Sequence, residues 1–115
     1  MRRFTGEGPV HTLLDEIAFG DLASLGAARR DEDETIIFYV DTLSEAEIVG
    51  TFTYRPISNQ IDITQPLGPA LAHFFNHQTH HRGQAHGLLT MIGGRDFAPS
   101  LDLILFQRET GIGMG

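Results

Sequence analysis

Histidines are concentrated in one short segment of this chain. The sequence has 115 residues and six histidines, and five of the six lie between positions 73 and 86. Neutral imidazole nitrogens are common ligands of divalent transition metals, so such a segment can hold an ion if its rings converge. The five residues are His73, His77, His80, His81 and His86.

Helical spacing decides which of these histidines can act together. Each residue of an α-helix turns by about 100°, so His77 and His81 lie on one face, one turn apart, with Cβ atoms roughly 5–6 Å from each other. Two imidazoles so placed can bind one ion through metal–nitrogen bonds of about 2.0–2.1 Å. His73 and His77 have the same spacing, and His77 and His80 have a less favourable one. Spacing alone leaves these pairs open, whereas His86 lies nearly opposite and is excluded.

The histidines belong to a long predicted helix. Pro66 and Pro69 suit the first turn of a helix, and from Leu67 no strong breaker follows until Gly93 and Gly94. Neutral imidazoles that face a core need polar partners, and a cation is a suitable one. We expect the paired histidines to face the core, because five further residues lie close to the same side of the helix: Phe74, Gln78, Ala85, Leu88 and Leu89.

A second long helix is predicted earlier in the chain. Asp21 can cap it, because its carboxylate can accept from free N–H groups of the first turn, and residues 41–44 end it. The charged run at 30–34 is predicted to be a solvated face. Residues that recur at three- and four-residue steps predict one buried stripe: Leu22, Leu25, Ala28, Arg29, Ile36, Val40 and Leu43.

Shorter elements complete the prediction. Ser44 and Glu47 can form a capping box for a short helical turn. Residues 50–56 and 61–63 alternate and predict a two-stranded ribbon, with turn chemistry at 58–60. Because two strands alone are marginally stable, the ribbon must pack on helices.

The chain ends and its domain count are predicted from the same patterns. A last short helix is expected over 101–108, and residues 10–17 form either a short helix or a compact loop. No linker or internal repeat interrupts the chain, so we predict a single domain over residues 1–115. The fold class is mainly all-α, with a small two-stranded β-ribbon.

The histidine segment resembles a known metal-site signature. Residues 75–84, Phe-Asn-His-Gln-Thr-His-His-Arg-Gly-Gln, are similar to the motif of the DinB-like (DinB/YfiT) metalloenzyme family. The similarity covers almost the whole chain and continues through shorter stretches: 19–22, 28–29, 52–54, 88–90 and 101–104.

The resemblance implies both a fold and a metal. Members of the family form an up-down four-helix bundle, in which three histidines hold a divalent metal, often nickel or zinc. His77 and His81 match the paired ligands on the last long helix of that pattern. The resemblance also implies a chain that is shortened at its N-terminus, so that the bundle is partial and the upstream histidine ligand is missing. A third ligand would then come from His11, Asp15 or Glu16, or from a histidine of a second copy, and without one the metal is absent.

Composition excludes several other classes of protein. The sequence has no cysteine, which removes thiol nucleophiles and Cys-zinc sites, and no lysine, which removes P-loop and Schiff-base enzymes. A formal net charge of −7 argues against nucleic-acid binding. No apolar run is long enough for a membrane span, and the N-terminus lacks a secretory pattern, so we expect a cytoplasmic protein.

Two functions follow as hypotheses. The first is a metal-dependent enzyme of the thiol-transfer or hydrolysis type, acting on a small-molecule thiol, in which His80 or Gln84 orients groups or moves protons and Arg82 holds a carboxylate or forms a structural contact. The second is a non-catalytic helical dimer that binds a metal or small ligand, or a truncated remnant without activity. Helices with an uncovered apolar side predict a homodimer in either case.

Overall fold

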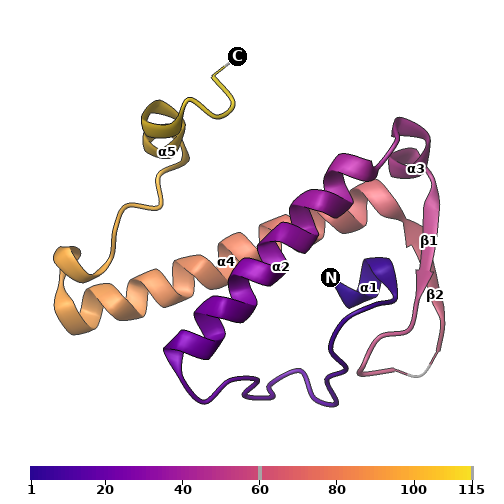
Figure 1. Cartoon of the computed structure of the whole chain (residues 1–115), viewed down its shortest axis with the longest axis horizontal. Coiled ribbons are helices and arrows are strands. Elements are labelled where there is room, and N and C mark those ends of the chain that lie inside the picture. The colour runs from indigo at the N-terminus through magenta and orange to yellow at the C-terminus, as the bar shows by residue number, and fades with distance from the viewer. Residues whose placement is uncertain (60, 115) are drawn as a thin grey trace. The chain divides into compact units, whose positions relative to one another are not determined.

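A computed structural model describes residues 1–59 and 61–114 of the chain (Figure 1). Within these ranges the chain forms five α-helices, one 3-10 helix and a two-stranded antiparallel sheet. The predicted fold class, mainly α with a small ribbon, is therefore confirmed. The chain divides into two compact units, Met1–Leu71 and Ala72–Gly115.

Helix α2 (Leu22–Thr42) is the longest element of the first unit and begins where the sequence predicts. The Asp21 carboxylate accepts a hydrogen bond from the Ser24 backbone N–H at 2.8 Å and a second one from the Ser24 hydroxyl at 2.7 Å. These bonds satisfy a backbone donor that a helix start leaves without a helical partner. The same contacts lower the pKa of Asp21, chiefly through the Ser24 backbone hydrogen bond.

The stripe predicted on α2 is buried only in part. Ile36 is buried, with 8% of its surface exposed, and Ala28 and Leu43 are half-buried. Helical periodicity fixes which residues share a face, but it does not determine how much of that face another element covers. The prediction was wrong for the four residues that stay exposed: Leu22, Leu25, Arg29 and Val40.

A short helix and the ribbon follow α2. Helix α3 (Glu45–Val49) starts with the predicted capping box of Ser44 and Glu47. Strands β1 (Thr51–Tyr54) and β2 (Ile63–Pro66) then pair antiparallel. Thr53 and Thr64 lie opposite each other in this pairing, and their hydroxyls form a hydrogen bond of 2.7 Å.

Two details of the ribbon correct the prediction. The second strand runs on to Pro66, which pairs with Thr51, so Pro66 ends a strand and does not open the helix. A proline is tolerated there because a two-stranded ribbon has only edge strands. The turn forms where the Asn59 N–H donates to the Pro56 carbonyl at 3.3 Å, and Gln60 of the predicted turn lies outside the described residues.

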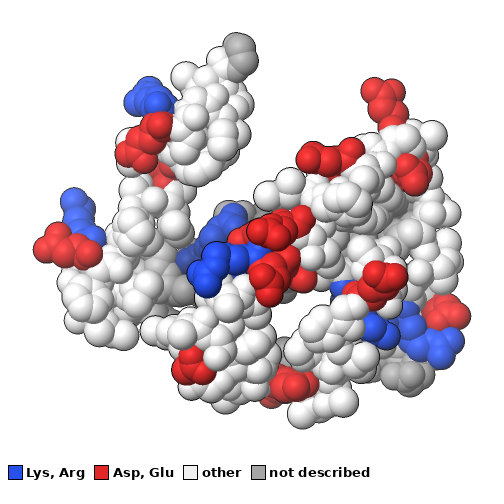
Figure 2. Space-filling view, viewed as in Figure 1, with Lys and Arg blue, Asp and Glu red and all other residues white. Residues whose placement is uncertain are grey.

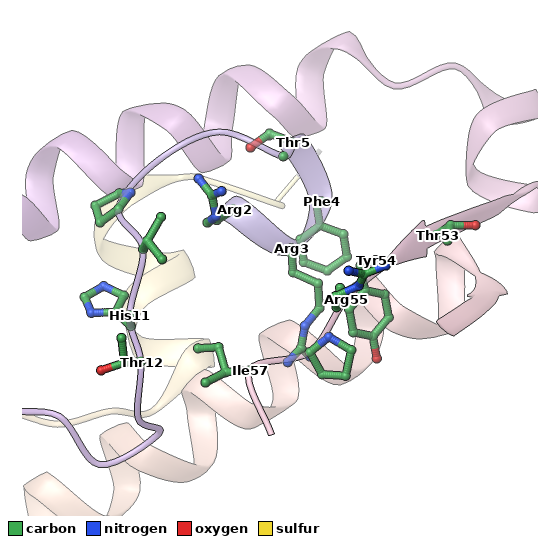
Figure 3. A pocket seen from close by; sticks show the side chains of 14 residues that line it. Arg2, Arg3, Phe4, Thr5, His11, Thr12, Thr53, Tyr54, Arg55 and Ile57 are labelled. Atoms are coloured by element: carbon green, nitrogen blue, oxygen red, sulfur yellow. The ribbon is translucent and has the colours of Figure 1, made fainter. Parts of the chain in front are cut away.

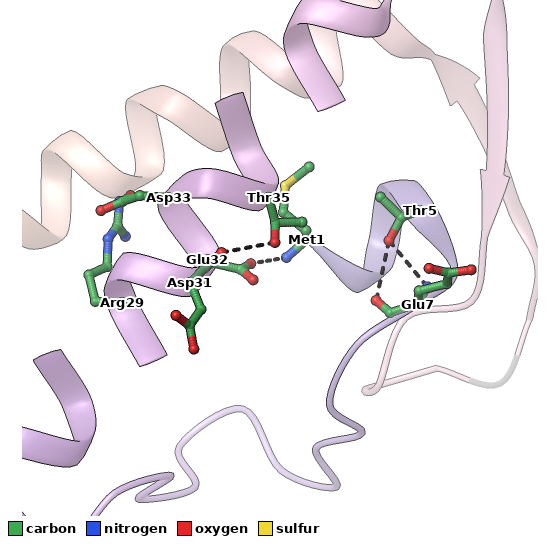
Figure 4. A network of polar contacts seen from close by, with 8 residues as sticks. All are labelled: Met1, Thr5, Glu7, Arg29, Asp31, Glu32, Asp33 and Thr35. Atoms are coloured by element: carbon green, nitrogen blue, oxygen red, sulfur yellow. Dashed lines mark hydrogen bonds and ion pairs between the residues drawn. The ribbon is translucent and has the colours of Figure 1, made fainter. Parts of the chain in front are cut away.

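The N-terminal segment is anchored to the first unit at its start. Helix α1 (Arg2–Thr5) is a single turn, and the Met1 amino group donates to the Glu32 carboxylate of α2 (Figure 4). The Phe4 ring stacks on Phe52 of β1, with ring centroids 5.2 Å apart, and lies 5.9 Å from the ring of Tyr39. Residues 10–17 adopt the loop alternative and form no helix.

The second unit contains most of α4 (Leu67–Gly93) and ends with a short helix. Helix α4 matches the predicted span, and the 3-10 turn η1 (Arg95–Phe97), which was not predicted, follows it. Helix α5 (Leu103–Thr110) begins later than predicted, because the Asp102 carboxylate caps it by accepting from the Ile104 N–H at 2.8 Å. No helix in residues 1–59 or 61–114 is both long and apolar enough to cross a bilayer.

The capping box of α3 gives a first test of the fold. The Ser44 hydroxyl accepts from the Glu47 N–H at 3.3 Å and donates to the Glu47 carboxylate at 2.7 Å. Replacing Ser44 with alanine removes both bonds and is expected to destabilise the protein by about 1 kcal/mol. Thermal or urea unfolding followed by circular dichroism measures this loss. The control is Ser58→Ala, because Ser58 is an exposed serine in the turn of the ribbon that caps no helix. Equal stability of Ser44→Ala and the original chain would show that the cap is unimportant.

The same box predicts a dependence on pH. The Ser44 hydroxyl and backbone N–H donate to the Glu47 carboxylate and hold the pKa of Glu47 below its ordinary value of 4.5. Because the folded pKa is lowered, the ionised carboxylate stabilises the fold at pH above 4.5. This stabilisation is lost as the pH falls through the lowered pKa. The stability difference between the original chain and Ser44→Ala should therefore shrink on acidification, as unfolding curves recorded from pH 7 to pH 3 will show; a constant difference contradicts this account.

Candidate metal centre

The side chains of His77 and His81 converge on the surface of α4. Their Nε2 atoms lie 3.0 Å apart, and the two rings meet edge to face, with centroids 4.5 Å apart and an interplanar angle of 89°. Both side chains are exposed. The convergence expected from their spacing is therefore present, and their role as metal ligands remains a prediction.

Gln84 fixes the orientation of the second ring. Its Oε1 atom lies 2.9 Å from Nδ1 of His81. A carbonyl oxygen can only accept, so Nδ1 of His81 carries the proton and Nε2 carries the lone pair in the neutral ring. In this state the Nε2–H of His77 donates to Nε2 of His81. A metal ion between the two Nε2 atoms would replace that proton, and the His77 proton would then reside on Nδ1.

The separation of the two nitrogens suits a shared ion. Two ligands of a tetrahedral zinc site with bonds of about 2.0–2.1 Å lie about 3.3 Å apart. The observed 3.0 Å is slightly shorter, and small rotations of two exposed side chains can supply the difference. The donor set also fits, because imidazole binds both zinc and nickel well. His77 and His81 thus provide half of a tetrahedral shell.

The other pairings left open by the sequence have different geometry. The rings of His73 and His77 are stacked, with centroids 5.5 Å apart and 24° between their planes. The His77 and His80 rings are also stacked, at 6.3 Å. Stacked rings direct their nitrogens side by side and not toward a common point, so the structure favours His77 and His81 over both alternatives.

The expectation that this pair faces the core was wrong. Of the residues on the same side of the helix, Phe74 and Gln78 are half-buried, while Ala85, Leu88 and Leu89 are exposed. The pair is therefore solvated, and the argument that a buried imidazole requires a cation does not apply.

The structure identifies no third ligand among the residues that it describes. Across residues 1–59 and 61–114 no three histidine, aspartate or glutamate side chains are placed so that they could hold one ion. His11 instead lies 3.6 Å from the Glu16 carboxylate, which accepts from the Thr12 N–H at 3.1 Å. That backbone bond lowers the pKa of Glu16. Asp15, the other carboxylate suggested by the sequence, lies in an exposed turn.

A separate pocket of the first unit was missed by the sequence analysis. It is an open pocket of about 910 Å³, lined by α1, the loop that follows it, the end of β1 and the residues just after β1 (Figure 3). Arg3 lies over the Tyr54 ring at 4.7 Å, Arg2 donates to the Gly8 carbonyl at 2.8 Å, and Arg55 donates to Asp62 at 2.7 Å. Its arginines come from segments far apart in sequence, so no local pattern could have revealed it.

Comparison with known proteins gives the family. Residues 21–110 match the model of the DinB family, and this range includes α2, the ribbon, α4 and α5. No curated protein and no solved structure matches the chain. The matched range covers most of the sequence and contains both converging histidines. The chain belongs to the DinB family.

Proposed function

We propose that this DinB-family chain binds a divalent metal ion, nickel or zinc, through His77 and His81. One observation carries the proposal: the Nε2 atoms of the two rings lie 3.0 Å apart, close to the separation of two ligands on one tetrahedral ion. Gln84 supports it, because its oxygen holds His81 in the tautomer that presents a lone pair at Nε2.

The chemistry that a metal would supply is activation of a nucleophile. A bound divalent ion lowers the pKa of a thiol or water, which suits thiol transfer or hydrolysis. His80 lies next to the pair, with its ring centroid 5.2 Å from that of His81, and can accept or donate a proton there. Arg82 donates to the Thr79 hydroxyl at 3.1 Å, which favours the structural contact for this residue over a carboxylate-binding role.

A second candidate function is non-catalytic metal binding. A catalytic zinc site has three protein ligands and an open position, whereas a structural site has four. The described residues bring two donors together. An ion that gains its remaining ligands from another protein chain has no open position and would serve assembly instead of catalysis.

Metal analysis of the purified protein tests the proposal. We expect the protein to bind a divalent ion. His77→Ala and His81→Ala should each lower the metal affinity by more than roughly 10–100-fold, which is the loss caused by replacing a residue that only hydrogen-bonds to a ligand. The measurement is elemental analysis after dialysis, combined with competition against a chromophoric chelator. His86→Ala is the matched control, because this histidine lies on the opposite side of α4 and should leave affinity unchanged. Equal metal content in the original chain, His77→Ala and His81→Ala would contradict the proposal.

The role of Gln84 gives a second test. Gln84→Met keeps the size of the side chain but removes the acceptor, so His81 loses its fixed orientation and affinity should fall about 10-fold or more. Gln84→Glu keeps an acceptor oxygen and should retain affinity. The same competition titration compares them, and circular dichroism checks that α4 is intact. If Gln84→Met binds metal as tightly as Gln84→Glu, the hydrogen bond does not position His81.

A further inference from the structure

The pocket beside α1 concentrates positive charge on an acidic chain. The sequence has 15 acidic residues and eight arginines, and three of these arginines line this one pocket: Arg2, Arg3 and Arg55. Among the described residues that line the pocket, none is acidic. Figure 2 shows a group of arginine side chains beside the ribbon, with acidic side chains at its margin. Positive charge on the wall of a pocket raises the local concentration of anions.

Two of the three arginines carry a charge that no carboxylate neutralises. Arg55 donates to the Asp62 carboxylate at 2.7 Å and forms an ion pair with it. Arg2 and Arg3 form no ion pair with any residue in 1–59 or 61–114. Both residues are exposed, so a ligand in solution can reach them. The pocket therefore has a surplus of two positive charges.

The guanidinium groups of Arg2 and Arg3 are each oriented by one neighbour. Arg2 donates to the Gly8 carbonyl at 2.8 Å, and Arg3 lies over the Tyr54 ring at 4.7 Å. Figure 3 shows Arg3 reaching from α1 past Phe4 toward Tyr54. A guanidinium has five N–H donors in a planar fork, so both groups retain donors for a ligand. Such forks bind carboxylate and phosphate groups through paired hydrogen bonds.

Much of the remaining lining is apolar. It comes from the loop after α1 and from the residues that follow β1: Pro9, Val10, Pro56 and Ile57. An inorganic ion would leave these side chains in water, whereas an organic ligand covers them and removes apolar surface from solvent. A pocket of about 910 Å³ has the size of sites that hold small organic molecules.

We propose that this pocket binds a small organic anion whose carboxylate or phosphate group is held by Arg2 and Arg3. The two head groups share the chemistry that arginine recognises, which is a pair of negatively charged oxygens side by side. The apolar body of the ligand lies against Val10 and Ile57. All residues that line the pocket belong to the first unit, whereas the histidine pair belongs to the second. The inference is therefore independent of the proposed metal binding.

The test uses probes that separate charge from shape. Benzoate and phenyl phosphate carry the two head groups on an aromatic ring. Benzamide has the shape of benzoate without its charge, and acetate and inorganic phosphate have the charge without the ring. The full chain, freed of metal on a chelating resin, is titrated with each probe in Tris buffer at about 0.15 M salt, where exposed charges more than about 8 Å apart are screened. NMR signals of the arginine Nε–H groups report the contact.

We expect benzoate, phenyl phosphate or both to shift the Arg2 and Arg3 signals until they saturate, while benzamide shifts neither. A response to benzoate alone assigns the pocket to a carboxylate, and a response to phenyl phosphate alone assigns it to a phosphate ester. The matching probe without a ring, acetate or inorganic phosphate, should bind at least about tenfold more weakly, because it leaves the apolar lining in water.

Variants connect the binding to the two arginines. Arg2→Gln and Arg3→Gln should each weaken binding at least about tenfold, because each removes a charge-assisted hydrogen bond. The matched control is Arg108→Gln, since Arg108 is an exposed arginine of α5 that lies outside the pocket lining. The backbone amide spectrum checks that each variant is folded.

Four results would overturn the proposal. They are no response to either ring-bearing anion, equal binding of benzamide and benzoate, equal binding of a ring-bearing anion and its counterpart without a ring, and unchanged binding in both Arg2→Gln and Arg3→Gln.

Discussion

The contact between the Nε2 atoms of His77 and His81 depends on one uninterrupted helix. The two Nε2 atoms lie 3.0 Å apart because α4 continues through both positions, so that the two residues are separated by one helical turn. Gly83 and Gly87 lie in the same helix, and each costs about 0.5–1 kcal/mol relative to alanine. The geometry of the pair is therefore maintained by a helix with weak positions close to it. Gln84 lies between these glycines and holds the second ring through the acceptor at 2.9 Å.

Interactions of a different kind organise the first unit. The Phe4 ring stacks on Phe52, and Phe52 stacks on Tyr54 with ring centroids 5.3 Å apart. The Arg3 guanidinium lies over the Tyr54 ring. These rings join the N-terminal turn to the ribbon, which two strands alone would hold only marginally. The Met1 amino group adds a link to α2 through Glu32. Aromatic packing thus gives this unit part of the cohesion that its small number of buried apolar residues cannot provide.

Local patterns predicted local structure well. Asp21, Ser44 and the glycines at 93 and 94 marked helix ends that the structure confirms, because caps and breakers act within one turn. The spacing of His77 and His81 predicted their convergence for the same reason. What covers a helix face depends on distant segments, and there the predictions for the stripe on α2 and the core-facing histidines were wrong. The arginine-lined pocket also combines distant segments, and it left no signal in the sequence.

At the end of α4, two glycines determine the backbone path because they carry no side chain. A Cβ built on Gly93 would lie 2.2 Å from Cγ and 2.7 Å from Cβ of Phe97, so the Phe97 side chain packs against bare backbone. Gly94 follows at φ 71° and ψ −166°, a conformation that is accessible essentially to glycine alone. Together the two glycines determine the direction in which the backbone leaves α4 toward η1 and α5. An ordinary residue at either position would send the last twenty or so residues in a new direction, although it would alter no group that carries chemistry.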